Sequence, residues 1–145
     1  MTRRQLPRGL YLLTPDEHDG ERLLARTLPL LPFASCVQLR AKGLDRHVLM
    51  TAGQRLRSAC RESDVAFIVN DSVALAKRLG ADGVHLGQSD GDPREARALL
   101  GAAAQIGVTC HDSRHLAMEA GEAGVDYVAF GAFYPTATKE TTHRP

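Results

Sequence analysis

Residues 125–139 read VDYVAFGAFYPTATK, an apolar, β-branched and aromatic run followed by a polar loop. The apolar part predicts a buried strand that ends at Gly131, where the backbone is free to turn. Pro135 then stiffens a loop that carries the hydroxyls of Thr136 and Thr138 and the ammonium of Lys139. The hydroxyls and the ammonium suit an anion. Ligands of parallel sheets bind at the carboxyl ends of the strands, which is where this loop is expected to lie.

The chain upstream alternates between apolar runs and helical patterns. The predicted strands, including the last one, cover residues 9–14, 36–40, 65–69, 83–87, 104–109 and 125–130. Five helices are expected between them. The first begins after Asp19 and is stopped by Pro29, and the second covers residues 45–60. The other three run from Ser72 to residue 79, from Asp92 to about residue 100, and over residues 113–123. Strands separated by helices indicate a parallel sheet with right-handed crossovers.

The fold class expected is therefore α/β, and the even spacing favours a TIM-type (β/α) barrel over a doubly wound sheet. Residues 1–145 are expected to form a single barrel domain. A complete barrel has eight strands and needs at least ~200 residues, so the barrel is expected to be incomplete, with about six of the eight strands and without the last two strand-helix units. Such an arc would have two open edges, which suggests a fragment or completion by another chain.

Composition narrows the classes of partner. The 145 residues include 18 basic and 17 acidic side chains, for a net charge of +1, with no long block of one sign. Small-molecule substrates are therefore expected, with no nucleic-acid or membrane partner, while a homo-oligomer stays open. The three cysteines have no metal-type spacing, and no signal-peptide pattern is present, which favours reduced, packed thiols in a cytoplasmic protein.

A basic triplet lies at the end of the second predicted strand. Gln38, Arg40 and Lys42 alternate with period two, so their side chains are expected to point the same way. Three donors on one side, two of them cationic, suit a diphosphate. Taken alone, the pattern fits a solvated strand end better.

Acidic residues follow the next two strands. Asn70 and Asp71 come directly after the third strand, and Asp90 follows the fourth. Two carboxylates at neighbouring strand ends are typical of Mg²⁺, which takes few protein carboxylates and leaves its other positions to water and phosphate oxygens. For either aspartate alone, a role in a turn or a helix cap is the simpler interpretation.

Together these groups predict a metal-bound diphosphate at one end of the sheet. Cations around such a group suit a reaction in which it departs, because they stabilise the negative charge that builds on the leaving oxygen. No nucleophilic triad is expected, since the side chains of Cys110 and His111 diverge on a strand.

Five stretches carry a family resemblance that runs from the first strand to the final loop. They are GLYLLT (9–14), VQLRAK (37–42), FIVND (67–71), ADGVHLGQSD (81–90) and FG through PTATK (130–139). In this order they resemble the motifs of thiamine-phosphate synthase. The resemblance implies a TIM-type barrel that joins hydroxymethylpyrimidine diphosphate to thiazole phosphate, with Mg²⁺ as cofactor, and releases pyrophosphate.

The resemblance also implies roles for individual residues. Asp71 and Asp90 would bind Mg²⁺, and Arg40, Lys42 and Lys139 would act catalytically on the departing pyrophosphate. The residues that would contact the two substrates are Gln38, Arg40, Lys42, Asn70, Thr109, Thr136, Thr138 and Lys139. In the family mechanism the diphosphate leaves first, and the thiazole nitrogen then captures the pyrimidinylmethyl cation.

The sequence departs from the family pattern at a few points. Ser72 stands where a second aspartate often follows, and Thr109 where a serine is usual. The seventh and eighth strands, whose glycine-containing loops serve the thiazole phosphate, are missing from the 145 residues. His85 is expected to be a packed, hydrogen-bonded histidine. The similar thiazole tautomerases are thought to use a histidine after the fifth strand as an acid or base, and His111 could play that part here. A tautomerase and a non-catalytic phosphate-binding remnant are therefore the alternative functions.

Overall fold

A computed structural model describes residues 6–137 of the chain. Six parallel strands form one sheet in sequence order, β1-β2-β3-β4-β5-β6. Their bounds are Tyr11–Leu13 (β1), Cys36–Leu39 (β2), Ala66–Asn70 (β3), Gly83–Leu86 (β4), Gln105–His111 (β5) and Tyr127–Phe130 (β6). Each strand pairs with the next one along the chain, as repeated right-handed strand-helix-strand units require. The predicted parallel (β/α) order is therefore confirmed.

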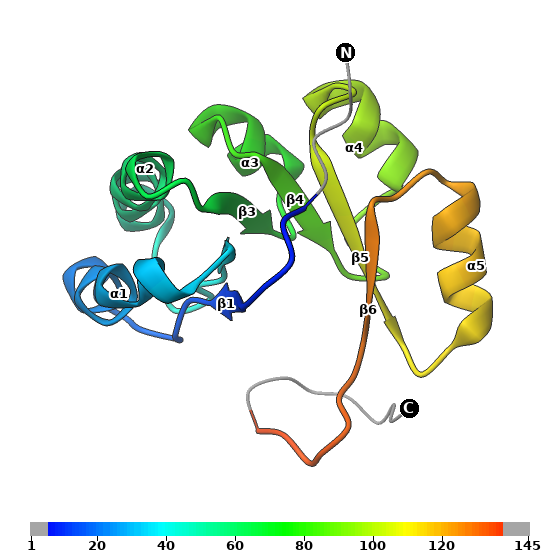
Figure 1. Ribbon diagram of the computed structural model, residues 1–145, viewed down its shortest axis with the longest axis horizontal. Coiled ribbons are helices and arrows are strands. Elements are labelled where there is room, and N and C mark those ends of the chain that lie inside the picture. Colours follow the sequence, from blue (N-terminus) through cyan, green and yellow to red (C-terminus); the bar gives the residue numbers. More distant parts are fainter. Residues whose placement is uncertain (1–5, 138–145) are drawn as a thin grey trace.

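Helices connect the strands and cover one side of the sheet (Figure 1). They are α1 (Gly20–Thr27), α2 (Arg46–Glu62), α3 (Val73–Leu79), α4 (Pro93–Leu100) and α5 (Arg114–Glu122), with a 3-10 helix η1 (Leu28–Phe33) after α1. The side chain of the residue before each α-helix accepts a backbone N–H of the first turn, which satisfies a donor that the helix itself cannot. These caps are Asp19, Asp45, Ser72, Asp92 and Ser113.

The first helix ends before Pro29, as predicted. α1 ends at Thr27, and the separate 3-10 helix η1 then runs through Pro29 and Pro32, which the sequence did not predict. Proline is tolerated at the first positions of a new helical turn, where its missing N–H would have had no partner. The predicted strands differ from the observed ones by one or two residues at their ends. β5 is the clearest case, since it runs on to His111.

The two faces of the sheet differ in character. Alternate residues of the central strands, such as Val37, Phe67, Val84 and Ile106, point to the helices and form a core with Leu23, Leu56 and Leu79. Phe67 and Ile106 are fully buried there. The residues between them point to the concave inner face, because side chains alternate along a strand. Among those inner residues are Gln38, His85 and Thr109, so the inner face carries polar groups beside a small apolar cluster of Cys36, Ala66 and Ile68.

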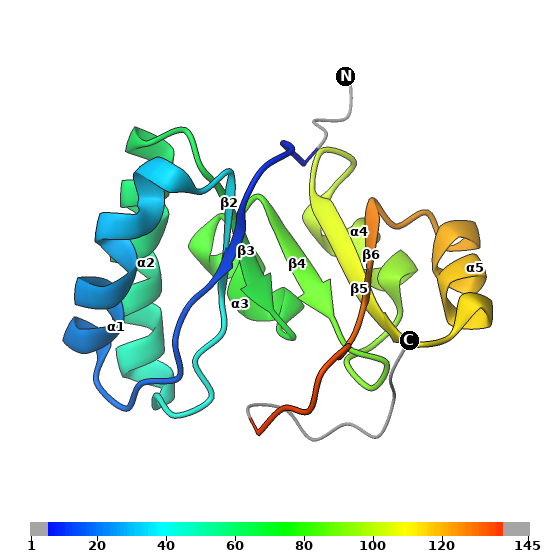
Figure 2. The same cartoon turned by 60° about the horizontal axis from the view of Figure 1, so that its bottom comes forward.

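The sheet curls so far that its two edge strands approach each other (Figure 2). The hydroxyl oxygens of Tyr11 on β1 and Tyr127 on β6 lie 2.7 Å apart, although 116 positions separate the two residues in the sequence. Their rings are 5.8 Å apart between centroids. Strand twist in a parallel sheet produces this curvature. The result is an arc of six strands around an interior that is partly polar and partly apolar.

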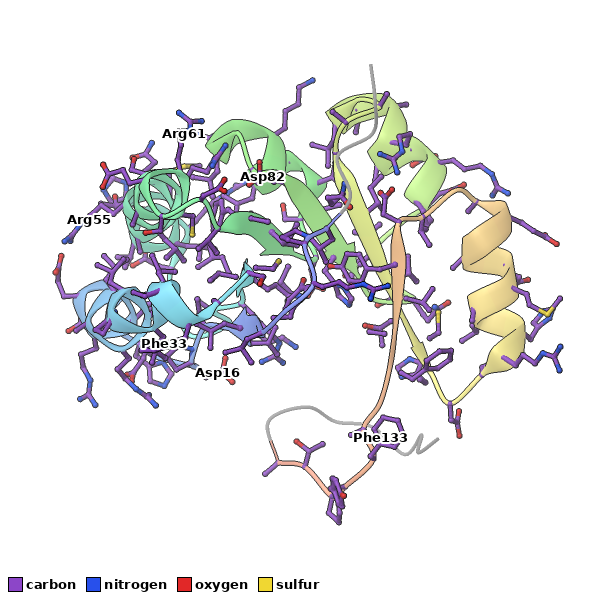
Figure 3. The ribbon with its side chains drawn as sticks, viewed as in Figure 1. Asp16, Phe33, Arg55, Arg61, Asp82 and Phe133 are labelled. Atoms are coloured by element: carbon purple, nitrogen blue, oxygen red, sulfur yellow. The ribbon has the colours of Figure 1, made fainter. Side chains whose placement is uncertain are left out.

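Aspartates before β4 and β6 tie the amino-terminal ends of the strands together. The carboxylate of Asp82, which lies near α3 in Figure 3, accepts the backbone N–H of Phe67 at 2.8 Å. In the same way, Asp126 accepts the N–H of Ile106 at 2.8 Å and an Arg97 N–H at 2.7 Å. These partly buried bonds fix the end of the sheet opposite the predicted site.

Candidate active site

A cavity of about 900 Å³ opens at the carboxyl ends of the strands. Its lining includes Gln38, Arg40, Lys42, Asn70, Asp71, Asp90, Thr109 and Thr136, which are all the predicted site residues that the structure describes. Thr138 and Lys139 lie outside the described residues, and so does any contact that they make. The structure thus brings the described site residues together, while their individual roles stay predictions.

The loops after β1 and β2 are joined by a reciprocal pair of hydrogen bonds. The Thr14 hydroxyl donates to the carbonyl oxygen of Arg40 at 2.9 Å, and the backbone N–H of Arg40 donates back to Thr14 Oγ1 at 2.8 Å. Thr14 is buried, so these bonds are shielded from water. They hold the backbone of Arg40 in place at the cavity edge.

The basic triplet reaches the cavity although only Gln38 belongs to β2. Arg40 and Lys42 follow the last residue of the strand, yet both line the cavity with Gln38, as the period-two spacing predicts. The Arg40 side chain is 14% exposed, and its guanidinium lies 3.5 Å from the Asp16 carboxylate. A guanidinium carries five N–H donors, so it can contact more than one anion.

The two predicted metal ligands lie on adjacent loops. Asp71 has a positive φ of 64°, which turns the chain sharply after β3, and its N–H donates to the His85 carbonyl at 2.8 Å. Asp90 accepts the Gly87 N–H on Oδ2 at 2.8 Å, so it has the turn role that was considered for it. A carboxylate has a second oxygen and further lone pairs, so this bond leaves Asp90 able to bind a cation.

The donor chemistry of this cavity fits Mg²⁺. Two carboxylates and the Asn70 amide come from neighbouring strand ends, and oxygen is the ligand atom that Mg²⁺ prefers. Residues 6–137 contain no group of three or more histidine, cysteine or acidic side chains placed to bind a metal. Two carboxylates that leave the remaining positions to water and a diphosphate are consistent with that result.

Hydrogen-bonded side chains form the cavity floor. Gln38 donates to the Tyr11 hydroxyl at 3.0 Å, and His85 lies 3.1 Å from the Tyr127 hydroxyl and 2.8 Å from the Thr109 hydroxyl. His85 is buried and hydrogen-bonded, as predicted. Burial raises the pKa of Tyr11 to about 12, and burial and the neighbouring Tyr11 also raise the pKa of Tyr127. Both phenols therefore keep their protons near neutral pH.

A register shift between Thr109 and His111 shapes the end of β5. His111 has a positive φ of 52°, and both it and Thr109 line the cavity. Cys110 between them is fully buried on the helix side, with its thiol 3.7 Å from the Val108 carbonyl. The predicted divergence of Cys110 and His111 is therefore confirmed. Burial raises the pKa of the Cys110 thiol, which makes it a poor nucleophile.

Three lining residues were not singled out from the sequence. Tyr11 and Tyr127 resemble ordinary core aromatics there, because nothing local shows that their hydroxyls meet. Gln88 donates to the Thr109 carbonyl at 2.6 Å and so ties the loop after β4 to β5. Its position inside the ADGVHLGQSD stretch is the one signal that could have indicated it.

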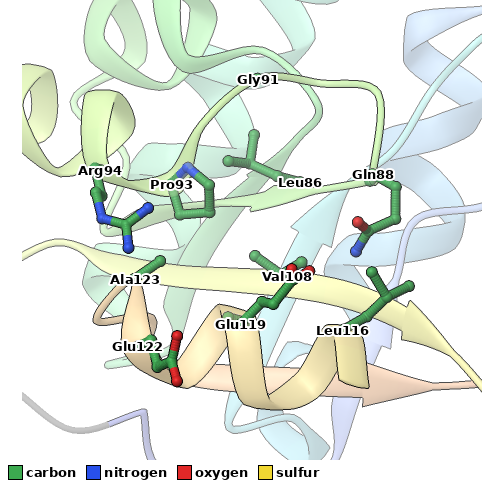
Figure 4. Close-up of a pocket in the computed structure, with 12 residues that line it drawn as sticks. Leu86, Gln88, Gly91, Pro93, Arg94, Val108, Leu116, Glu119, Glu122 and Ala123 are labelled. Carbon is green, nitrogen blue, oxygen red and sulfur yellow. The ribbon is translucent and has the colours of Figure 1, made fainter. Parts of the chain in front are cut away.

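A second cavity, of about 300 Å³, lies on the helix side of the sheet. It is placed between α4 and α5, over β4 and β5, with Arg94, Glu119 and Glu122 around it (Figure 4). It shares Gly87 and Gln88 with the larger cavity, but none of the predicted site residues lines it. It is therefore not the candidate active site.

Comparisons with known proteins decide the family. A family model described as thiamine monophosphate synthase matches residues 10–145. The chain belongs to the thiamine monophosphate synthase family. The resemblance read from the five motifs is therefore confirmed, and with it a transferase family of thiamine biosynthesis.

Individual relatives agree with this family. The chain is 55% identical over 143 residues to a thiamine-phosphate synthase of Erythrobacter litoralis, an alignment that covers 97% of this chain and 67% of the relative. It is 54% identical over 140 residues to a thiamine-phosphate synthase of Xanthomonas campestris, which covers 97% of this chain and 68% of the relative. The chain therefore spans about two thirds of the length of these relatives.

A solved structure of a thiamine phosphate pyrophosphorylase from Pyrococcus furiosus supports the fold. It superposes with a TM-score of 0.73 at 30% identity and covers 88% of this chain and 62% of its own. Within the described residues, the family's TIM-like arrangement is present as six strands and the five α-helices between them, which confirms the predicted fold class. Within residues 6–137, none of the helices has both the length and the apolar character that crossing a membrane requires.

Proposed function

We propose that the protein is a thiamine-phosphate synthase, which joins hydroxymethylpyrimidine diphosphate to thiazole phosphate with release of pyrophosphate. The observation that carries this proposal is that Arg40, Lys42, Asp71 and Asp90, from three neighbouring strand ends, line one cavity. Such a set of cations and carboxylates suits a metal-bound diphosphate. Membership of the synthase family supports the same substrates.

In the reaction, the bond between the pyrimidine methylene carbon and the diphosphate oxygen breaks, and a bond from the thiazole nitrogen to that carbon forms. No proton transfer and no protein nucleophile are needed. Arg40 and Lys42 would bind the pyrophosphate oxygens on which negative charge develops, with Lys139 as a third predicted cation. The low exposure of Arg40 favours this role, because attraction between charges is stronger where water is excluded.

Asp71 and Asp90 would hold Mg²⁺, which supplies positive charge to the leaving group when it is bound. Asn70 and Gln38 would orient the pyrimidine diphosphate, and Thr109 would contact its ring. Thr136 and Thr138 would bind the thiazole phosphate. Two substrates held side by side react as though within one molecule, which is a large part of the acceleration expected in such a cavity.

The metal and diphosphate site can be tested apart from turnover. Magnesium and pyrophosphate together are expected to raise the melting temperature of the protein, and Asp71→Asn should abolish the shift. Asparagine suits the test because it tolerates the positive φ of position 71, which alanine does not. Asp64→Asn is the matched control, because Asp64 also has a positive φ, 54°, but does not line the cavity. No shift in the parent protein would contradict the proposed site.

Turnover separates the candidate functions. Formation of thiamine phosphate from the two substrates would establish the synthase, and Asp71→Asn should lower its rate roughly 100-fold. His111 lines the cavity, which makes a tautomerase the second candidate. Isomerisation of a thiazole carboxylate phosphate without metal would establish that activity instead. Binding of pyrophosphate without either reaction would indicate a phosphate-binding remnant.

A further inference from the structure

Five side chains on the inner face join end to end through hydrogen bonds. Gln38 Nε2 lies 3.0 Å from Tyr11 Oη, which lies 2.7 Å from Tyr127 Oη. Tyr127 Oη is 3.1 Å from His85 Nδ1, and His85 Nε2 is 2.8 Å from Thr109 Oγ1. The chain of bonds runs through β2, β1, β6, β4 and β5 in turn, and it ends at the cavity.

Counting the protons on each side chain gives this series of hydrogen bonds a direction. The Gln38 amide donates to Tyr11, and the shortest contact open to the single proton of Tyr11 is the one with Tyr127. With Tyr11 as the donor there, the proton of Tyr127 is available to Nδ1 of His85. A neutral imidazole that accepts on Nδ1 carries its proton on Nε2, and this N–H donates to Thr109. Within residues 6–137, no other side-chain partner is found for the Thr109 hydroxyl, so its proton is left to point into the cavity.

We propose that Tyr127 is a positioning residue that holds His85 with its proton on Nε2 and thereby makes the Thr109 hydroxyl a hydrogen-bond donor to a ligand. The ligand class is a heteroaromatic ring with an acceptor nitrogen. The identity of that ring as the substrate pyrimidine rests on the proposed function, whereas the state of His85 does not. With the opposite direction, Thr109 would donate to His85 and would offer the ligand only lone pairs.

The packing around Tyr127 supports a fixed geometry. Its ring lies over Gly107 on the neighbouring strand, where an added Cβ would come within 2.1 Å of Tyr127 Cζ. The ring centroids of Tyr127 and His85 are 5.5 Å apart, and His85 is 8% exposed. Neither ring can turn without disturbing its neighbours. The raised pKa of both phenols keeps a proton on each hydroxyl, as the chain of donors requires.

Nuclear magnetic resonance of ¹⁵N-labelled histidine tests the first half of the proposal. The parent protein is expected to show the ring of His85 protonated on Nε2. Tyr127→Phe keeps the aromatic ring and removes the hydroxyl, so it should increase the share of the Nδ1-protonated form. Tyr134→Phe is the control, because Tyr134 is 82% exposed and does not line the cavity. A parent His85 protonated on Nδ1, or a state unchanged by Tyr127→Phe, would overturn the proposal.

Ligand affinity tests the second half. Tyr127→Phe should weaken binding of hydroxymethylpyrimidine diphosphate about 10-fold, the worth of one hydrogen bond, and leave binding of magnesium pyrophosphate unchanged. Because the effect acts through Thr109, Tyr127→Phe should cost no further affinity in a Thr109→Val background. An equal loss in both backgrounds, or a loss for pyrophosphate too, would mean that Tyr127 has only a packing role.

The two proposals fail in different ways. If the proposed function is wrong, the parent protein shows neither a magnesium pyrophosphate shift nor product, whatever the state of His85. If the inference is wrong, the parent makes thiamine phosphate while Tyr127→Phe changes neither the His85 ring nor the affinity for the pyrimidine diphosphate.

Discussion

Gly107 and Tyr127 illustrate how closely single residues depend on each other in this sheet. The two are paired on neighbouring strands, and the phenol ring occupies the space that any side chain at position 107 would need. A glycine inside a strand lacks a side chain to pack and normally weakens it. Here the aromatic ring of the partner strand covers the glycine, so the position is filled from across the pair.

Gly107→Ala is therefore expected to destabilise the protein. The new methyl group would displace the Tyr127 ring, at a cost of about 1–3 kcal/mol in the free energy of unfolding, as for other overpacked sites. Urea unfolding measures this. Gly121→Ala is the control, since Gly121 lies in α5 with open space around it and should instead gain up to ~1 kcal/mol. A smaller cost of Gly107→Ala in a Tyr127→Ala background would confirm that the ring is the cause.

Arg40 offers a direct test of the charge in the cavity. Arg40→Met keeps much of the side-chain volume and removes the guanidinium, so kcat/KM for the proposed synthase reaction should fall roughly 100-fold. Arg55→Met on α2 is the matched control, because Arg55 is half-exposed, forms an ion pair with Glu21 and does not line the cavity. Equal activity of the two variants would remove Arg40 from the proposed catalytic group.

At this scale the sequence predicts the rim of the cavity better than its floor. Arg40, Asp71 and Asp90 are recognisable because spacing and position after a strand are local properties. The bond between Tyr11 and Tyr127 depends on how far the sheet curls, and 116 positions separate the two residues. No local pattern contains that information. The hydrogen-bonded state of His85 was expected. Its partners were not, because they lie on other strands and no local pattern identifies them.

Among the elements, α4, β5 and β6 are linked through Asp126 and through bonds from Arg97 to the Ala104 and Gly124 carbonyls. Asp126 receives an Arg97 N–H and the backbone N–H of Ile106. Its side chain is 9% exposed, and that of Arg97 is 21% exposed. A buried ion pair of this kind leaves an uncompensated charge when one partner is removed.

Asp126→Ala is expected to lower the free energy of unfolding by ~3 kcal/mol, because the Ile106 N–H loses its acceptor and Arg97 loses its ion-pair partner, although its bonds to backbone carbonyls remain. Thermal and urea unfolding check this. Asp92→Ala serves as the comparison, since Asp92 mainly caps α4 from an exposed position and its loss should cost only ~1 kcal/mol. If the two variants lose the same stability, the link through Asp126 is weaker than the geometry indicates.

The helices were more predictable than the ends of the strands. Capping residues such as Asp19, Ser72 and Asp92 are recognised from one side chain and the pattern that follows, and all three cap the helices expected of them. Strand ends depend on pairing with a neighbour, which is why β5 extends to His111 beside Phe130. The stop before Pro29 was predicted correctly, whereas the 3-10 helix after it was not, because proline excludes a continuing α-helix but not a new 3-10 turn.

The molecule as a whole is expected to lose stability in alkali. Burial raises the pKa of the Cys36 and Cys60 thiols to about 12, whereas thiols of an unfolded chain ionise near ~8.5. The folded state therefore keeps two protons that the unfolded state releases. This contribution is complete below about pH 8.5 and is lost as the pH rises towards about 12.

Urea unfolding at pH 7, 8.5 and 10 measures this dependence. The free energy of unfolding should fall between pH 8.5 and 10, and the fall should be smaller in Cys60→Ala. The comparison uses the slope with pH, because the cavity left by Cys60→Ala lowers stability at every pH. An identical slope in the variant would show that the Cys60 thiol ionises alike in both states.

For the whole molecule, the alternation of strands and helices was sufficient to predict the order and direction of all six strands. The curvature of the sheet was not predictable from that alternation. It becomes visible through a contact between the first and last strands, which a list of successive elements does not contain.

The meeting of the Tyr11 and Tyr127 hydroxyls also limits how deeply a ligand can sink. The two phenols span the interior between opposite margins of the sheet, below the level of Arg40 and Asp90. On the proposed function, the pyrimidine ring would rest on these phenols, and its diphosphate would reach the basic and acidic side chains above. The distance between the two levels would then favour a ring and a diphosphate joined by a short spacer.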